Sequence, residues 1–216
     1  MARRIGSAIP AMAAAVIVLI ASCGGGGAGG GDGGGGDGGG GDGGGGDQSR
    51  MLTVDDVDKI VLQPAEAPPG TTYDGGNSGM VTAEVLTQQV PGAAAQLNSL
   101  GMQGAQVSLF VAPDHTLVGS AALVFPDAAA ADRAMDVQTG VVLPAVATGV
   151  RPLAAAKIGD ESAAVAFESG PTGLPGGSVV FRVRNAMFFM NGSGPSIRPD
   201  DLVHLAGVVA ERATRS

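Results

Sequence analysis

QVSLFVAPDHTLVGSAALVF, residues 106–125, is the stretch that decides the fold. Val107, Leu109 and Val111 recur at every second position, which is the period of a β-strand. The second half, Leu117–Phe125, is apolar on both alternating faces, as is typical of a strand in the middle of a sheet. The residues P-D-H-T between the two halves predict a turn. The stretch therefore predicts a β-hairpin whose second strand is central.

Strands and helices are also expected on both sides of this hairpin. We predict strands around Ala163–Phe167, Val179–Val183 and Met187–Met190, and helices over residues 82–89, 91–100, 127–138 and 199–215. Residues 140–152 are rich in valine and proline, and they favour an irregular or partly helical segment. Asn185 is expected to take a left-handed turn conformation. Hairpin-linked strands with helices between them predict an α+β domain, with an antiparallel sheet of about four to six strands and helices packed mainly on one face.

Charge and composition restrict the partners of this domain, residues 51–216. It holds nine Lys and Arg against sixteen Asp and Glu, a net charge of −7. An acidic domain without a basic stripe argues against nucleic acid as a partner. The whole chain has one Tyr, six Phe and no Trp, which disfavours aromatic platforms for sugars or bases. The abundance of alanine and valine is typical of high-GC bacterial genomes, such as those of actinobacteria.

The N-terminus has the features of a secretory signal. Arg3 and Arg4 precede an apolar run from Ala8 to Ala21, which is shorter than the roughly 20 apolar residues that span a bilayer. Ile20-Ala21-Ser22-Cys23 resembles the lipobox of bacterial lipoprotein precursors. That resemblance implies cleavage before Cys23, acylation of its thiol, and attachment to the cell membrane with the domain on the extracytoplasmic side. More than one acyl chain on Cys23 would make the attachment stable.

A glycine-rich segment separates Cys23 from the domain. Residues 24–50 are nearly all glycine, with an aspartate at every fifth position from 32 to 47. Such a sequence cannot build a core and predicts a disordered tether with a root-mean-square reach of roughly 25–30 Å. The period and the lack of apolar residues disfavour a calcium-binding β-roll. The chain therefore divides into a signal peptide (1–22), a lipidated cysteine with its linker (23–50) and one domain (51–216).

No candidate for catalysis or metal binding stands out in the domain. Asp114 and His115 adjoin in a predicted turn, where neighbouring side chains point apart, and His204 falls on the polar side of the last helix. The run Asn191-Gly192-Ser193-Gly194 lacks the spacing of a nucleophile elbow and favours a glycine-rich loop. Three acidic pairs begin turns or helices, where capping explains them: Asp55/Asp56, Asp160/Glu161 and Asp200/Asp201. We therefore predict no catalytic residue, no cofactor and no metal.

Arg182 and Arg184 form the best cationic pair, on the predicted outward face of one strand. They can receive an acidic partner, although such pairs more often serve as a solvated sheet face. Ile158–Glu161 and Phe181–Asn185 resemble segments of uncharacterised extracytoplasmic α+β lipoprotein and sensor-like domains, and the resemblance implies no functional residue. Two hypotheses remain. The chain is a non-catalytic binding, sensor or accessory module for an envelope protein, or it carries a small apolar ligand in an internal cavity.

Overall fold

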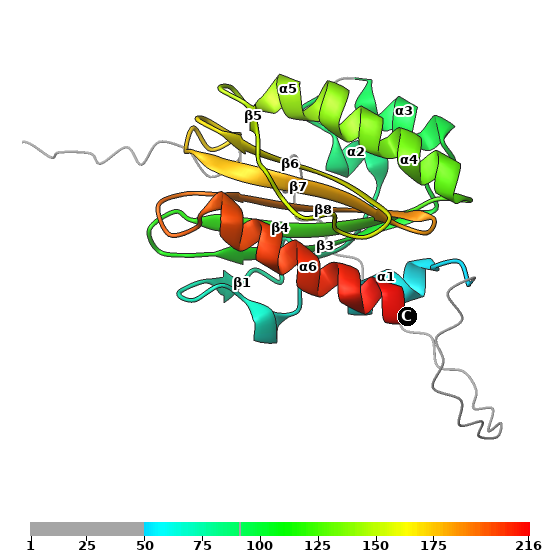
Figure 1. The fold of residues 1–216 in the computed structure, drawn as a ribbon, viewed down its shortest axis with the longest axis horizontal. Helices are drawn as coiled ribbons and strands as arrows, with labels where there is room; N and C mark the ends of the chain where they lie inside the picture. Colours follow the sequence, from blue (N-terminus) through cyan, green and yellow to red (C-terminus); the bar gives the residue numbers. More distant parts are fainter. Residues whose placement is uncertain (1–49, 91) are drawn as a thin grey trace, which may run out of the picture.

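The computed structural model describes residues 50–90 and 92–216, which form an antiparallel eight-stranded sheet with helices on both sides (Figure 1). The strand order is β1-β3-β4-β8-β7-β6-β5, and β2 pairs with β3 on the edge that β1 also occupies. The strands are β1 (Thr72–Tyr73), β2 (Gly79–Val81), β3 (Gly104–Val111), β4 (Leu117–Val124), β5 (Arg151–Pro152), β6 (Glu161–Phe167), β7 (Gly176–Val183) and β8 (Ala186–Ser193). The predicted α+β class is confirmed. The predicted signal peptide, Cys23 and nearly all of the linker lie outside the described residues.

The sheet has more strands than the four to six that the sequence predicts. Five strands are seven or eight residues long, namely β3, β4, β6, β7 and β8. The other three have two or three residues each, which is too short for a periodic pattern to be recognised in the sequence.

The middle of the sheet joins two hairpins that are distant in sequence. β3 pairs with β4 and β7 pairs with β8, as expected for neighbouring strands. β4 then pairs with β8 over eight residues, from Leu117 opposite Ser193 to Val124 opposite Ala186. The prediction that Leu117–Phe125 contains a central strand is therefore confirmed.

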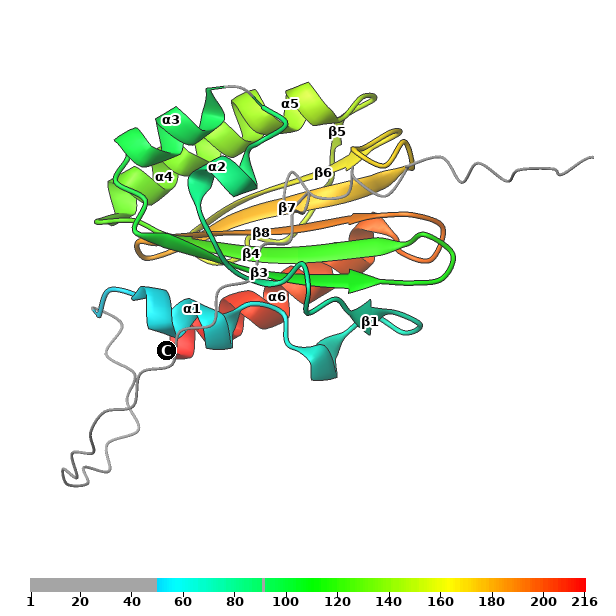
Figure 2. The same cartoon turned by 180° about the vertical axis from the view of Figure 1, so that it is seen from behind.

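The helices are divided between the two faces of the sheet. They are α1 (Val54–Ile60), α2 (Ala83–Leu86), α3 (Ala93–Ser99), α4 (Ala128–Val137), α5 (Leu143–Val146) and α6 (Pro199–Arg215), with a 3₁₀ turn η1 (Pro64–Glu66) and a π-helix η2 (Gln138–Val142). α1 and α6 cover one face, whereas α2, α3, α4 and α5 lie over the other (Figures 1 and 2). In the parts of the chain that the structure describes, no helix is long and apolar enough to cross a membrane.

This two-sided cover differs from the expectation that helices pack mainly on one face. The reason is that the central strands are apolar on both faces, so both faces need a helical layer. Phe188 stacks on Phe181 under α6, with 5.1 Å between the ring centroids. Phe189, the next residue of β8, belongs to the core under α4 together with Val180 of β7.

Candidate functional site

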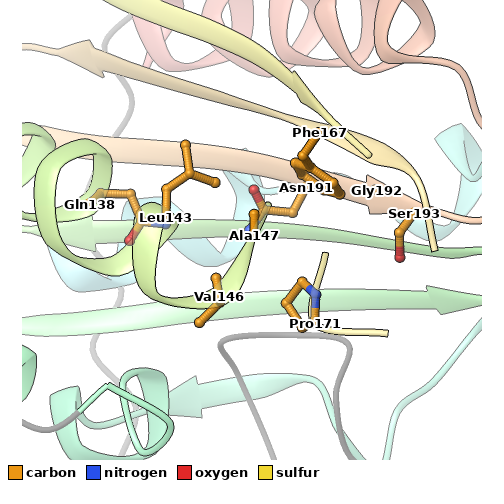
Figure 3. Close-up of a pocket in the computed structure, with 9 residues that line it drawn as sticks. All are labelled: Gln138, Leu143, Val146, Ala147, Phe167, Pro171, Asn191, Gly192 and Ser193. Carbon is orange, nitrogen blue, oxygen red and sulfur yellow. The ribbon is translucent and has the colours of Figure 1, made fainter. Parts of the chain in front are cut away.

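A small pocket lies between the sheet and the helical segment that follows α4 (Figure 3). Its volume is about 20 Å³, which is room for roughly one or two water molecules. The lining residues come from η2, α5 and its C-cap residue, the end of β6, the loop after β6 and the end of β8: Gln138, Leu143, Val146, Ala147, Phe167, Pro171, Asn191, Gly192 and Ser193. None of these side chains carries a charge.

One half of the pocket is apolar. Leu143 and Ala147 pack against Phe167 in a small cluster separate from the two main cores, and Val165 of β6 lies against that cluster. Val146 is half-buried and adds to the same wall. The apolar wall therefore belongs to α5 and β6, at the edge of the sheet and away from the central strands.

The other half of the pocket presents carboxamides without partners. Gln138 is only 7% exposed, yet its side-chain amide makes no hydrogen bond within residues 50–90 and 92–216. The amide of Asn191 in β8 is likewise without a partner among these residues. Figure 3 shows Gln138, Leu143 and Ala147 on the helical side, facing Asn191 on β8. Neither amide is among the fully buried side-chain atoms that lack a partner, so both carboxamides are open to the pocket, where solvent or a ligand can bind them.

A third unpaired polar group lies next to Asn191. Ser178 of β7 is directly opposite Asn191 in the β7–β8 pair, and it is 2% exposed. Its Oγ is buried without a hydrogen-bond partner in the described part of the chain. Both residues are an even number of positions from Val180 and Phe189 on their strands, so both side chains lie on the α4 face of the sheet. Ser178 and Asn191 therefore lie on the same side of the β7–β8 pair.

The helical side of the pocket is a widened turn. In η2 the N–H of Leu143 binds the carbonyl of Gln138, five residues earlier, so the α-helical ladder is interrupted. Pro144 accounts for this because it has no N–H to bind the carbonyl of Gly140, and its ring clashes with that carbonyl in a regular helix. Such π-turns within helices are frequent at functional sites. Residues 140–152, for which the sequence favours an irregular or partly helical segment, contain the end of η2, α5 and β5.

A second, more open depression lies beside the edge strand β2. It has a volume of about 460 Å³ and is lined by residues of β2, α2, α3 and the start of β3, among them Met80 and Met102. The carboxylate of Glu84 accepts a hydrogen bond of 2.7 Å from Asn98 across it. The pKa of Glu84 is lowered, first by a hydrogen bond from its own backbone N–H and then by hydrogen bonds from the side chains of Thr82 and Asn98. Because Glu84 and Asn98 bind each other and this depression is open to solvent, we regard the Gln138–Asn191 pocket as the better candidate site.

Arg182 and Arg184, the predicted partner-binding pair, lie outside this pocket and are engaged by the chain itself. Arg182 donates to Asp160 at 3.1 Å and to the carbonyl of Arg184 at 3.0 Å. Arg184 is in the turn between β7 and β8, with φ of 53°, and donates to the carbonyls of Arg50 and Ala213. The two side chains therefore do not share a strand face, and their binding of a partner stays a prediction.

The turn between β7 and β8 also corrects the expectation for Asn185. The left-handed residue is Arg184, whereas Asn185 is buried. Asn185 Nδ2 donates to the carbonyls of Leu52 and Phe125, and its Oδ1 accepts from the N–H of Leu52. Asn185 therefore links the start of the domain to the middle of the sheet.

The two histidines and Asp114, which the sequence offered as candidates for catalysis or metal binding, lie outside the pocket. His115 is exposed in the β3–β4 turn with φ of 67°, and His204 is exposed on α6. Hydrogen bonds from Ser196 and from the backbone N–H of Thr116 lower the pKa of Asp114. Within the residues described, no group of three or more His, Cys, Asp or Glu could hold a metal ion.

Two of the acidic pairs do cap helices as predicted. Asp56 accepts hydrogen bonds from the backbone and side chain of Thr53 before α1. Asp201 accepts from the backbone and the guanidinium of Arg198 before α6, and the side-chain bond is the main reason that its pKa is lowered.

Asn191 is the residue for which the sequence interpretation was wrong. The run Asn191–Gly194 was expected to be a loop, but β8 extends through Ser193. Ser193 is 5% exposed and its hydroxyl lies 3.0 Å from that of Thr172. Gln138 was likewise missed, although Gly140 and Pro144 in an apolar segment could have indicated a distorted helix there.

Glu161 stands in an acidic environment at the start of β6. Its pKa is raised, first by a hydrogen bond with Asp132 and then by the charge of Asp132, while Arg182 acts in the opposite direction. Asp136 of α4 adds to the increase. The neighbouring carboxylate of Asp132 therefore favours the protonated form of Glu161.

The folded protein is expected to lose less stability between acidic and neutral pH when Glu161 is replaced by glutamine. A raised pKa in the folded chain means that the contribution of Glu161 is fully present below about 4.5, the ordinary value, and is lost as the pH rises through the raised value. Thermal unfolding from pH 4 to 7.5 should show the Tm of E161Q gaining on wild type as the pH rises. Glu84→Gln is the control and should change in the opposite direction, because the pKa of Glu84 is lowered. A Tm difference for E161Q that does not vary with pH would contradict the prediction.

Comparison with known proteins gives one structural similarity. No protein-family model matches the sequence, and no curated protein matches it. The fold is similar to the crystal structure of the extracellular domain of PknH from Mycobacterium tuberculosis, with a TM-score of 0.41 and 12% sequence identity. The similarity covers 77% of this chain and 93% of that chain. A similarity of this size carries no conclusion about ligand or partner.

Proposed function

We propose that this protein is a lipid-anchored, extracytoplasmic binding module without catalytic activity, and that the Gln138–Asn191 pocket is its recognition site. We assign this role to the pocket because the carboxamides of Gln138 and Asn191 line it and bind no other group in the described residues, although Gln138 is almost fully buried. Both amides are open to the pocket, so a ligand there can bind them in place of solvent. The sequence Ile20–Cys23 supports the lipid anchor.

The pocket favours recognition of a short chemical group over carriage of a whole apolar ligand. Its volume of about 20 Å³ is far below the roughly 300–1,000 Å³ of pockets that enclose small molecules. A partner would insert one group and remain largely outside. The larger depression beside β2, of about 460 Å³, is open to solvent and does not enclose a ligand. These features support a sensor or accessory module more than the alternative hypothesis of an apolar carrier.

Blocking the pocket tests the binding role. In Val146→Phe a larger side chain fills the half-buried wall of the pocket, whereas Val141→Phe places the same change on an exposed residue of η2 that does not line it. A fragment screen by ligand-observed NMR on the full chain in detergent should find fragments that bind wild type and V141F but lose at least tenfold in affinity for V146F. Equal binding to V146F would show that the pocket is not the site.

Replacing Cys23 by alanine is expected to abolish fatty-acyl labelling and release the protein from membranes. Cys23 offers the thiol that the lipobox resemblance requires, and the sequence contains no other cysteine. Metabolic labelling with a fatty-acid probe and membrane fractionation measure the result. Ser22→Ala is the control, because it keeps a small residue before Cys23 and should keep the label. Persistent labelling of C23A would overturn the lipid anchor.

A further inference from the structure

The sheet edge at β2 contains a buried hydrogen-bond acceptor that the chain leaves unpaired. Gln106 of β3 is directly opposite Met80 of β2 and is 6% exposed. Its Nε2 donates to Oδ1 of Asp58 in α1 at 2.8 Å. Its Oε1 is fully enclosed and has no hydrogen-bond partner in the described part of the chain. Since buried polar atoms are nearly always paired, an acceptor enclosed without a donor is unusual.

The carboxylate of Asp58, which binds this amide, is not paired with a cation. Asp58 is exposed, and none of the ion pairs in residues 50–90 and 92–216 includes it. Asp55, three positions earlier on the same side of α1, is also exposed and outside these ion pairs. Lys59 follows Asp58 but forms no ion pair with either carboxylate. The side of α1 that faces β2 therefore has an excess of negative charge.

The unpaired atoms restrict the kind of ligand that fits beside them. The atom of Gln106 that needs a partner is an acceptor, because Nε2 is already engaged by Asp58. An ionised carboxylate has acceptors only. A ligand that binds both residues must therefore donate two hydrogen bonds, and the charge of Asp58 favours a cation. The guanidinium of arginine and the ammonium of lysine have N–H donors and no acceptor.

The strand β2 provides an unpaired backbone edge next to these groups. β2 pairs with β3 alone, so no strand lies on its other side in the residues that the structure describes. Met80 is 54% exposed, although it is a large apolar residue. Side chains directly opposite each other in a sheet have their Cβ atoms about 5 Å apart, so Met80 lies beside Gln106. The methionine side chain is unbranched and flexible, and its movement can open Oε1 to a ligand.

We propose that the β2 edge binds an extended segment of a partner protein that carries a basic side chain. The segment adds a strand to β2, as in other complexes that extend a sheet. Met80 moves aside, and the cation pairs with Asp58 while it donates to Oε1 of Gln106. The open depression on the other side of β2 leaves room for the next side chain of the segment. This surface lies outside the Gln138–Asn191 pocket and does not depend on the role proposed for it.

The test uses the synthetic peptide TVRVT, blocked at both ends, and the full chain in detergent. Titration should shift the ¹⁵N side-chain signal of Gln106 in a saturable manner. A peptide with citrulline, which has the shape of arginine without its charge, should bind roughly tenfold more weakly or worse. A peptide N-methylated at its three central residues cannot pair with β2 and should lose affinity to a similar extent.

A matched pair of variants tests the role of Asp58. Asp58→Asn keeps an oxygen that accepts from Gln106 but removes the charge, so it should weaken the arginine peptide roughly tenfold or more and leave the citrulline peptide unchanged. Asp55→Asn removes a charge from the same helix and should cost less than about threefold, because only general attraction is lost. Circular dichroism should show both variants folded as the wild type.

Each contrary result overturns a stated part of the proposal. Equal binding of the citrulline peptide, or full affinity in D58N, would exclude the basic side chain. Equal binding of the methylated peptide would exclude strand addition. If no peptide shifts the Gln106 signal, the whole proposal fails. Self-association of the wild type that D58N abolishes, measured by sedimentation, would assign the edge to a second copy in place of a partner. V146F should bind the arginine peptide like the wild type, so failure of the pocket and failure of this edge are distinguishable.

Discussion

Replacing Asn185 by alanine is expected to lower the free energy of unfolding by about 2–5 kcal/mol. Asn185 is 1% exposed, and its amide binds the carbonyls of Leu52 and Phe125 at 3.0 and 2.8 Å. It also accepts from the N–H of Leu52 at 2.8 Å. Alanine leaves these buried backbone groups unsatisfied, and each such group costs about 1–3 kcal/mol. The loss is expected to detach the start of the domain from the sheet.

Chemical denaturation monitored by circular dichroism measures this effect. Asn98→Ala is the matched control, since Asn98 is exposed and has a single side-chain bond, to Glu84. Its cost should stay within about 0.5 kcal/mol, as for most surface substitutions. A loss below about 1 kcal/mol for N185A would contradict the structural role that we assign to this residue.

Replacing Gly176 by alanine is expected to cost about 3 kcal/mol or more, or to prevent folding. A Cβ at Gly176 would lie 2.0 Å from the carbonyl oxygen of Gly192 and 2.8 Å from Cα of Ser193. These are backbone atoms of the paired strand β8, so relief requires the β7–β8 pair to separate at that end. Gly192 and Ser193 also line the pocket, and ligand binding should weaken together with stability.

Gly207→Ala in α6 is the matched control for this substitution. A Cβ there meets no atom within 4 Å. Alanine should stabilise the helix by up to about 1 kcal/mol, because glycine is the poorer helix former. Urea unfolding of both variants measures the two changes. If G176A were as stable as wild type, the close approach of β7 and β8 would not exist in solution.

The sequence predicted those strands and helices whose formation depends on residues that are close together in the chain. The alternation of Val107, Leu109 and Val111 and the apolar run after the turn led directly to the β3–β4 hairpin. Asp127 was expected to cap a helix, and its side chain accepts from the N–H of Ala130 at 2.7 Å. Capping and strand alternation are properties of neighbouring residues, so they can be recognised in one sequence.

The arrangement of these elements could not be predicted in the same way. The pairing of β4 with β8 joins residues about seventy positions apart, and no local pattern specifies which strands become neighbours. The pocket depends on the same long-range pairing, because Gln138 follows α4 while Asn191 lies in β8. Both residues have ordinary polar side chains. They become notable only because the fold brings them to the same pocket.

The two ends of the β7–β8 hairpin contact different parts of the domain. Its turn holds Leu52, where the chain enters the domain, whereas its open end brings Gly192 and Ser193 to the pocket. An eight-residue strand at about 3.3 Å per residue places these two points roughly 26 Å apart. The pocket therefore lies at the far end of this hairpin from the point where the chain enters the domain. A partner bound at the pocket would not contact the N-terminal tether.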